Sequence, residues 1–239
     1  MQNEIIALQD NHTWDIVDLP EGKHAIGCKW VYKVKRHSDG TIERYKARLV
    51  AKGYTQEEGL DYHETFAPVI KMTTIRTVLK IAASNHWPLF QMNVNNAFLH
   101  GTLDEEVYMT LSPGHSSLYK GQKKVCRLKK SLYGLKQASR QWFSKFTESI
   151  ESLGFKQSLH DYSLFTYDKE GQFLILLVYV DDVILTGTSS SLIQQVKEFI
   201  HATFKIKDLG LLKYFLGIEV ARSDSGIFIN QRKCHGPSH

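Results

Sequence analysis

Two adjacent aspartates, Asp181 and Asp182, interrupt an apolar and β-branched stretch, "LILLVYVDDVILTG" (residues 174–187). A desolvated pair of carboxylates repels itself and is normally excluded from such a segment unless a cation meets it. Divalent cations would neutralise this repulsion. The alternative is an ordinary turn, because Asp is a common turn residue.

The aspartates stand where a hairpin is expected to turn between two apolar strands. Adjacent residues on a strand face opposite ways. We therefore expect one carboxylate to point into a cleft and the other to be only partly turned towards it.

Two basic segments lie on an otherwise acidic chain, although the net charge is only +5. Residues 29–53 hold eight Lys/Arg against two acids, and residues 120–140 hold another eight and no acid. Trp30, Tyr32, Tyr45 and Tyr133 are interleaved with these cations. This combination is typical of a surface that binds a phosphodiester backbone. Solvated, Lys-rich edge hairpins are the alternative.

Composition favours an ordinary globular protein, since the 239 residues include 42% apolar side chains. The cysteines, Cys28, Cys126 and Cys234, contain no C-x-x-C pair, which argues against a zinc knuckle or a disulfide framework and favours a reducing compartment. No apolar run reaches the roughly 18 residues of a membrane span, and the N-terminus does not read as a targeting signal. We expect no membrane partner and an intracellular location, cytoplasmic or nuclear.

Several elements that position the aspartates are predicted from periodicity. Residues 4–18 read as a short helix followed by a strand, and 28–55 as a basic hairpin around "HSDG" with its cations on one face. Helical spacing is found at 73–86, 139–154 and 189–204. Strands are expected at 88–98, 105–114 and 163–187, and a further hairpin at 213–233. This order predicts an α+β fold with helices on one face of a mostly antiparallel sheet.

The motifs that accompany these elements resemble one family from about residue 14 to 233. They are "GCKWVYKVKR", "RYKARLVAKGYTQEEGLDYHETFAPV", "NAFLHG", "VCRLKKSLYGLKQASRQW", "LLVYVDDVILTG" and "LKYFLGIEV". The chain resembles the reverse transcriptase domain of copia-type long-terminal-repeat retrotransposon polyproteins. The resemblance implies a right-hand polymerase forming a single domain over 1–239. In it, the fingers include the hairpin at about 28–55, and the palm, at about 73–220, has an antiparallel sheet backed by helices.

The resemblance also implies a chemistry and a set of residues. Tyr179, Val180, Asp181 and Asp182 would form the hairpin that holds two Mg²⁺ ions, or Mn²⁺, under an incoming nucleotide. In two-metal phosphoryl transfer one ion activates the primer 3′-hydroxyl and the other holds the triphosphate, about 3.5–4 Å away. The implied partners are an RNA or DNA template-primer and dNTPs.

Five positions are implied to bind the nucleotide: Lys46, Arg48, Phe98, Gln137 and Tyr179. Lys46 and Arg48 would reach the phosphates, Phe98 would crowd a ribose 2′-hydroxyl, and Gln137 would lie near the nucleotide. Core packing is the alternative for Phe98. A generic basic strand is the alternative for Lys46 and Arg48.

Two departures from the family pattern stand out. The first metal ligand of the family is an aspartate, and Asn93 occupies that position here. Asparagine keeps a carbonyl oxygen, but it is neutral and cannot bridge two cations as a carboxylate does. The family continues after "QRK" into a helical segment, whereas residues 234–239 read as an aberrant tail, so the thumb is expected to be largely missing.

Three hypotheses follow from the sequence. The first is an RNA-directed DNA polymerase impaired at position 93 and at its C-terminal end. The second is a non-catalytic nucleic-acid-binding remnant, which needs only the basic segments. The third is a transposon relic without function. The oligomeric state is left open.

Overall fold

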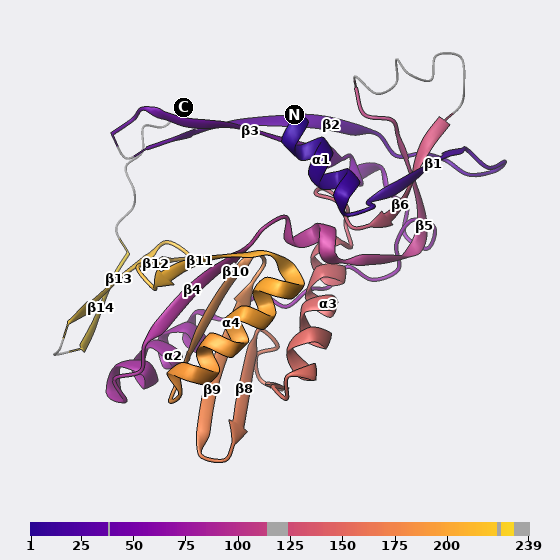
Figure 1. Ribbon diagram of the computed structural model, residues 1–239. Coiled ribbons are helices and arrows are strands. Elements are labelled where there is room, and N and C mark those ends of the chain that lie inside the picture. Colours follow the sequence, from indigo (N-terminus) through magenta and orange to yellow (C-terminus); the bar gives the residue numbers. More distant parts are fainter. Residues whose placement is uncertain (38, 114–123, 224–225, 232–239) are drawn as a thin grey trace. The chain divides into compact units, whose positions relative to one another are not determined.

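The computed structural model describes residues 1–37, 39–113, 124–223 and 226–231 (Figure 1). These residues form four α-helices together with sheets whose strand ladders are all antiparallel. The α+β class is therefore confirmed. The tail at 234–239 and Cys234 lie outside the described residues, as do Lys120 and Lys123 of the second basic segment. No helix in the described ranges is long and apolar enough to cross a membrane.

The chain forms two compact units that alternate along the sequence. Unit 1 comprises Met1–Ala67 and Asn96–Phe146, and unit 2 comprises Pro68–Asn95 and Thr147–His239. The range 73–220, expected to be the palm, is therefore divided between the two units, because residues 96–146 belong to unit 1.

Unit 1 is built from two small sheets around an apolar core. Its elements are α1 (Gln2–Asp10), β1 (Trp14–Asp18), β2 (Cys28–Arg36), β3 (Ile42–Ala51), η1 (Gly53–Thr55), η2 (Ala97–His100), β5 (Thr102–Thr110), β6 (Lys124–Lys130) and the first part of α3 (Ala138–Ser152). One sheet has the order β1-β6-β5, and β2 and β3 form a separate hairpin. Cys28 and Cys126 are buried free thiols, and burial raises the pKa of Cys126 to about 12.

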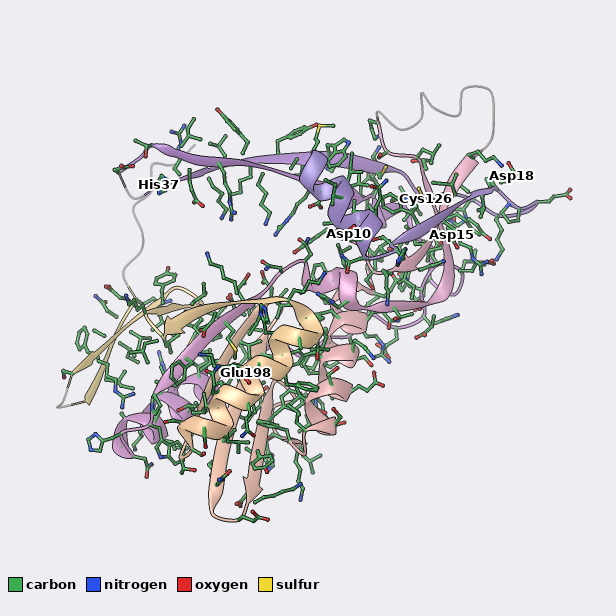
Figure 2. All side chains as sticks on the ribbon, viewed as in Figure 1. Asp10, Asp15, Asp18, His37, Cys126 and Glu198 are labelled. Carbon is green, nitrogen blue, oxygen red and sulfur yellow. The ribbon has the colours of Figure 1, made fainter. Side chains whose placement is uncertain are left out.

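The β2–β3 hairpin has two chemically different faces (Figure 2, where His37 marks its turn). Directly opposed residues of an antiparallel pair share a face. One face therefore carries Lys29, Lys33, Lys35, Arg44, Lys46 and Arg48. The other carries Trp30, Tyr32, Val34 and Tyr45. The expected cationic face is confirmed.

Unit 2 is built around a six-stranded sheet of order β11-β4-β10-β9-β8-β7. Its elements are α2 (Met72–Ser84), β4 (Leu89–Val94), the last part of α3, β7 (Lys156–Gln157), β8 (Leu164–Lys169), β9 (Gln172–Tyr179), β10 (Asp182–Gly187), α4 (Ser190–Phe204), β11 (Ile206–Leu211), β12 (Tyr214–Phe215), β13 (Ile218–Ser223) and β14 (Gly226–Asn230). The last three strands form a small sheet of their own.

The six-stranded sheet is covered on both faces, so the prediction of helices on one face is wrong. The buried stripe of α2 packs in one cluster with Ile175, Leu177 and Ile184. On the other face, Lys197 of α4 lies 4.5 Å from the ring centroid of Phe90, and successive strand residues point to opposite faces. Figure 1 shows α2 and α4 on opposite sides of the sheet. The physical reason is that β9 is buried at every position from 174 to 178, and both of its faces need cover.

Most local elements begin and end close to where periodicity predicts them. Helix α2 buries Ile75, Val78, Leu79 and Ala82, whose helical spacing places them on one face. Helix α4 is capped by the Ser189 side chain, which accepts a hydrogen bond from the Leu192 amide. The edge strand β11 was not predicted, because its apolar residues are mostly exposed and follow no strand-like alternation.

Candidate active site

The two aspartates lie at a tight turn between β9 and β10. Tyr179 and Asp182 face each other across the hairpin, so Val180 and Asp181 form the turn. Val180 adopts a φ of +52°. This left-handed conformation is strained for a β-branched residue, and such strain tends to occur at functional sites.

Asn93 joins both carboxylates. It lies at the end of β4, directly across from Asp182 in the ladder. Its Nδ2 donates to Asp181 Oδ2 at 3.1 Å and to Asp182 Oδ1 at 3.2 Å. The Val94 amide also donates to the Asp181 carbonyl at 2.7 Å, which fastens the turn to β4. Asn93 therefore lies within hydrogen-bond distance of both aspartates.

The expectation that one carboxylate would point into a cleft and the other be only partly turned towards it needs correction. Asp181 belongs to the turn rather than to a strand, so strand alternation does not separate it from Asp182. Both carboxylates converge on one amide nitrogen.

The electrostatics of this cluster disfavour two full charges. Burial raises the pKa of Asp182, and the neighbouring Asp181 charge raises it further. Side-chain hydrogen bonds from Asn93 and Gln91 act in the opposite direction. The Asn93 amide thus partly compensates a repulsion that a cation would remove entirely.

The donor set suits one hard cation better than two. Two carboxylates at one turn are oxygen ligands of the kind that Mg²⁺ prefers. Nowhere in the described ranges do three or more His, Cys, Asp or Glu side chains gather as a metal-binding group. The third position, Asn93, directs its N–H group at the carboxylates and contributes no charge.

A second cluster, in unit 1, contains two of the predicted nucleotide-binding residues. The guanidinium of Arg48 lies 4.2 Å from the ring centroid of Tyr133. The Tyr133 ring in turn meets Phe98 edge to face, with centroids 4.7 Å apart. Arg48 Nε is buried and has no hydrogen-bond partner among the described residues. Tyr133, which sequence reasoning assigned only to a basic segment, connects the cation to the aromatic ring.

Lys46 lies on the same face of the hairpin as Arg48. Burial lowers the pKa of Lys46, and the Arg48 and Arg44 charges lower it further. Glu4 acts in the opposite direction. The cations on this face therefore repel one another, and a bound anion would relieve that repulsion.

Comparison with known proteins decides the family. A model described as "Reverse transcriptase (RNA-dependent DNA polymerase)" matches residues 11–236. The chain belongs to this family. It is 46% identical over 234 residues to a retrovirus-related Pol polyprotein from transposon RE1 of Arabidopsis thaliana, and 43% identical over 236 residues to one from transposon TNT 1-94 of Nicotiana tabacum. Each match covers 98% of this chain but only 16% and 18% of the relatives, so the chain spans less than a fifth of their length.

Among solved structures, the chain is similar to a telomerase from Candida albicans. The TM-score is 0.43 at 11% identity, covering 96% of this chain and 50% of the telomerase chain. The assignment to the family depends on the sequence matches and not on this likeness.

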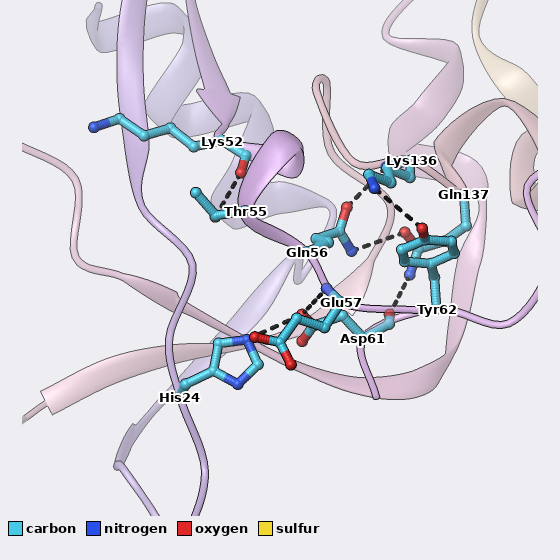
Figure 3. Close-up of polar contacts among 9 residues, drawn as sticks. All are labelled: His24, Lys52, Thr55, Gln56, Glu57, Asp61, Tyr62, Lys136 and Gln137. Atoms are coloured by element: carbon cyan, nitrogen blue, oxygen red, sulfur yellow. Dashed lines mark hydrogen bonds and ion pairs between the residues drawn. The ribbon is translucent and has the colours of Figure 1, made fainter. Parts of the chain in front are cut away.

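Gln137, another predicted nucleotide-binding residue, is fully buried in unit 1. Its Oε1 accepts from Gln56 Nε2 at 3.1 Å, and its Nε2 donates to the Asp61 carbonyl at 2.9 Å (Figure 3). Gln56 Oε1 accepts from the Lys136 amide at 2.8 Å. The Gln137 amide therefore holds residues 56–61 against the segment that carries Tyr133. Its own polar atoms are not exposed.

The same network includes an acidic side chain that sequence reasoning did not single out. Asp61 is buried, and its Oδ2 accepts from the Glu57 amide at 2.9 Å and lies 3.0 Å from His24 Nε2 (Figure 3). Lys136 Nζ donates to the Tyr62 hydroxyl at 3.0 Å. Gln56, Asp61 and Tyr62 all fall in the motif "RYKARLVAKGYTQEEGLDYHETFAPV", which was the available signal.

Tyr179, the last predicted nucleotide-binding residue, is half-buried beside Asp182 in the sheet ladder. Its ring packs against the core cluster beneath α2. Tyr179 therefore packs the turn against the core of unit 2, while part of the Tyr179 side chain is exposed.

Proposed function

We propose that this chain is the RNA-directed DNA polymerase domain of a retrotransposon Pol polyprotein, and that its activity is reduced by the asparagine at position 93. The observation that carries the proposal is the convergence of Asn93, Asp181 and Asp182 at one turn in a chain of the reverse transcriptase family. In this proposal the six-stranded sheet of unit 2 is the palm, and the β2–β3 hairpin is part of the fingers.

Asp181 and Asp182 would hold Mg²⁺ or Mn²⁺, since their oxygens are the charged ligands of the cluster. The bound metal supplies charge stabilisation to the reacting phosphate and lowers the pKa of a coordinated hydroxyl. The protein contributes a stiff support: the turn is fixed by β9, by β10 and by the hydrogen bond from the Val94 amide.

The nucleotide side of the proposal assigns roles in unit 1. Lys46 and Arg48 bind phosphates, because their charges are crowded and Arg48 Nε has no partner among the described residues. Phe98 limits the space for a ribose 2′-hydroxyl, and Tyr133 orients both Arg48 and Phe98. Gln137 acts as a positioning residue that holds this segment, and Tyr179 supports the turn of the metal-binding aspartates.

The proposed substrates are dNTPs and an RNA or DNA template-primer. Cations on one face of the hairpin neutralise phosphates, and this kind of contact binds a backbone without reading its sequence. Binding should therefore weaken as the salt concentration rises.

Primer extension with Mg²⁺ or Mn²⁺ tests the polymerase proposal. Each 1.36 kcal/mol of lost transition-state stabilisation slows the reaction by a factor of ten, and a bound metal supplies several kcal/mol of such stabilisation. We therefore expect Asn93→Asp to raise the rate of primer extension by on the order of a thousandfold. Adding Asp181→Asn to that variant should abolish extension again. Equal rates for the unaltered chain and Asn93→Asp would contradict the role given to position 93.

A non-catalytic nucleic-acid-binding function is the second candidate, favoured by the single cationic face of the hairpin. It predicts salt-dependent binding of a primer-template without extension, even by the Asn93→Asp variant.

A further inference from the structure

The Asn93 amide is hydrogen-bonded to both carboxylates. Its nitrogen lies 3.1 Å from Asp181 Oδ2 and 3.2 Å from Asp182 Oδ1, so one N–H group bonds to each. A Mg²⁺ ion bridging the same two oxygens needs to approach each to about 2.0–2.1 Å. A cation cannot sit there while amide hydrogens point at the same position.

From this arrangement we infer that Asn93 competes with metal ions at the turn, and that the site of this chain binds one divalent cation and not two. The inference rests on the proposed function, because it concerns the same site. It assigns to Asn93 the role of an internal substitute for a cation, which stabilises the carboxylate pair when metal is absent.

The position of Asn93 in the sheet supports this reading. Asn93 is paired on one side with Asp182 and on the other with Lys207 of β11. Directly opposed residues of neighbouring strands share a face. The row therefore contains Lys207, Asn93, Asp182 and Tyr179. Together with the adjacent Asp181, these residues carry two carboxylates and one lysine, a net charge of −1, which disfavours the binding of a second divalent ion.

The alternative is that the Asn93 amide flips when a metal ion binds and presents its Oδ1 atom as a ligand. The two readings predict opposite effects of removing the side chain. If the amide competes, Asn93→Ala frees both carboxylates and strengthens metal binding. If the amide is a ligand, the same change removes an oxygen donor and weakens binding.

Titration with Mn²⁺ alone, followed by the loss of the free-ion electron paramagnetic resonance signal, counts ions and measures affinity without any turnover. Ions that still bind to the Asp181→Asn/Asp182→Asn double variant are subtracted as unrelated to the turn. Asp168→Asn, at an exposed position near the far end of β8, is the matched control and should leave the count unchanged.

We expect one ion for the unaltered chain, two for Asn93→Asp, and one for Asn93→Ala with an affinity on the order of tenfold higher, because two hydrogen bonds to charged groups no longer have to be broken. Two ions on the unaltered chain, weaker binding by Asn93→Ala, or one ion only on Asn93→Asp would overturn the inference.

A second measurement uses the unaltered chain and does not depend on the folding of a variant. The side-chain amide resonances of Asn93 in a ¹⁵N-labelled sample should shift when Mg²⁺ saturates the site, because the amide leaves the carboxylates. Unchanged resonances at saturation would contradict competition.

The outcomes also separate this inference from the proposed function. If Asn93→Asp binds two ions and still does not extend a primer, the polymerase proposal fails and the competition stands. If Asn93→Asp extends a primer while the unaltered chain already binds two ions, the competition fails and the polymerase proposal stands.

Discussion

Gly134 lies where a side chain would collide with strand β3, and its replacement tests the packing that orients Arg48. Gly134 has a φ of +94°, and a Cβ atom there would lie 2.2 Å from the Ala51 carbonyl oxygen and 2.7 Å from Val50 Cγ1. The adjacent Tyr133 carbonyl accepts a hydrogen bond from the Ala51 amide at 2.8 Å. The segment that carries Tyr133 is therefore in direct backbone contact with β3.

Gly59 provides a matched control in the same unit. Its φ of +82° is similar, but a Cβ atom there would meet nothing within 4 Å. Gly59→Ala should cost about 1 kcal/mol of stability, because left-handed backbone costs an L residue roughly 1–2 kcal/mol and the unfolded chain loses some entropy in return.

Gly134→Ala should carry the same backbone cost and, in addition, the separation of two backbone segments. Loss of the Ala51–Tyr133 hydrogen bond adds about 1 kcal/mol, and the broken packing at least as much again, for a total of about 3 kcal/mol. With a urea m-value of about 2 kcal/mol/M, the unfolding midpoint of Gly134→Ala should lie about 1 M below that of Gly59→Ala. Equal midpoints would refute the close approach of Tyr133 to β3, and with it the proposed orientation of Arg48.

Three further outcomes are expected. Gln137→Leu should lower the free energy of unfolding by about 2–4 kcal/mol in urea titrations, because it leaves Gln56 Nε2 and the Asp61 carbonyl buried without a partner. Burial raises the pKa of Asp182, so the folded state favours its protonated form. The stabilisation by the protonated form is complete below the ordinary carboxyl pKa and is lost as pH rises through the pKa of the folded state. Asp182→Asn should therefore raise the melting temperature at pH ~7 without divalent cations, with a gain that shrinks towards pH ~4; a gain that grows on acidification would contradict this sign. Lys33→Gln, on the cationic face of the hairpin, should reduce the salt dependence of primer-template binding by about one counterion, whereas Lys169→Gln at the end of β8 should leave it unchanged.

Local sequence rules were sufficient to predict the hairpins and the turn that carries the two aspartates. Alternating residues and the "HSDG" signal define β2 and β3 together with their cationic face. The Asp pair between two apolar strands locates the turn, and the family motif locates Asn93 beside it. These features depend on residues that are close in sequence, or on a motif whose spacing is fixed.

The arrangement of helices around the sheet was harder to predict, although a signal was present. Helices α2 and α4 each have one apolar stripe, and the stripe does not say which face of a sheet it covers. The continuous run "LILLV" of residues 174–178 was informative, since a strand with only one covered face alternates and this one does not.

The burial of Gln137 could not be inferred from its neighbours in sequence. Its partners Gln56 and Asp61 precede it by 81 and 76 residues. A polar residue in a motif suggests ligand contact, and only the three-dimensional arrangement shows that its amide is used inside the protein.

The way the chain alternates between the two units constrains the order in which the protein folds on the ribosome. Among the described strands, β4 (Leu89–Val94) pairs with β10 and β11, which begin at Asp182 and Ile206. For about the time needed to synthesise the intervening residues, the nascent β4 has no partner on either edge, and closing so long a loop is entropically costly. Every strand described for unit 1 has been synthesised once β6 is complete, so unit 1 can fold first while residues 68–95 remain without their strand partners. Chaperones that shield unpaired strand edges should therefore act on β4 during synthesis, and ribosome-bound chains that stop before Asp182 should expose it to proteases.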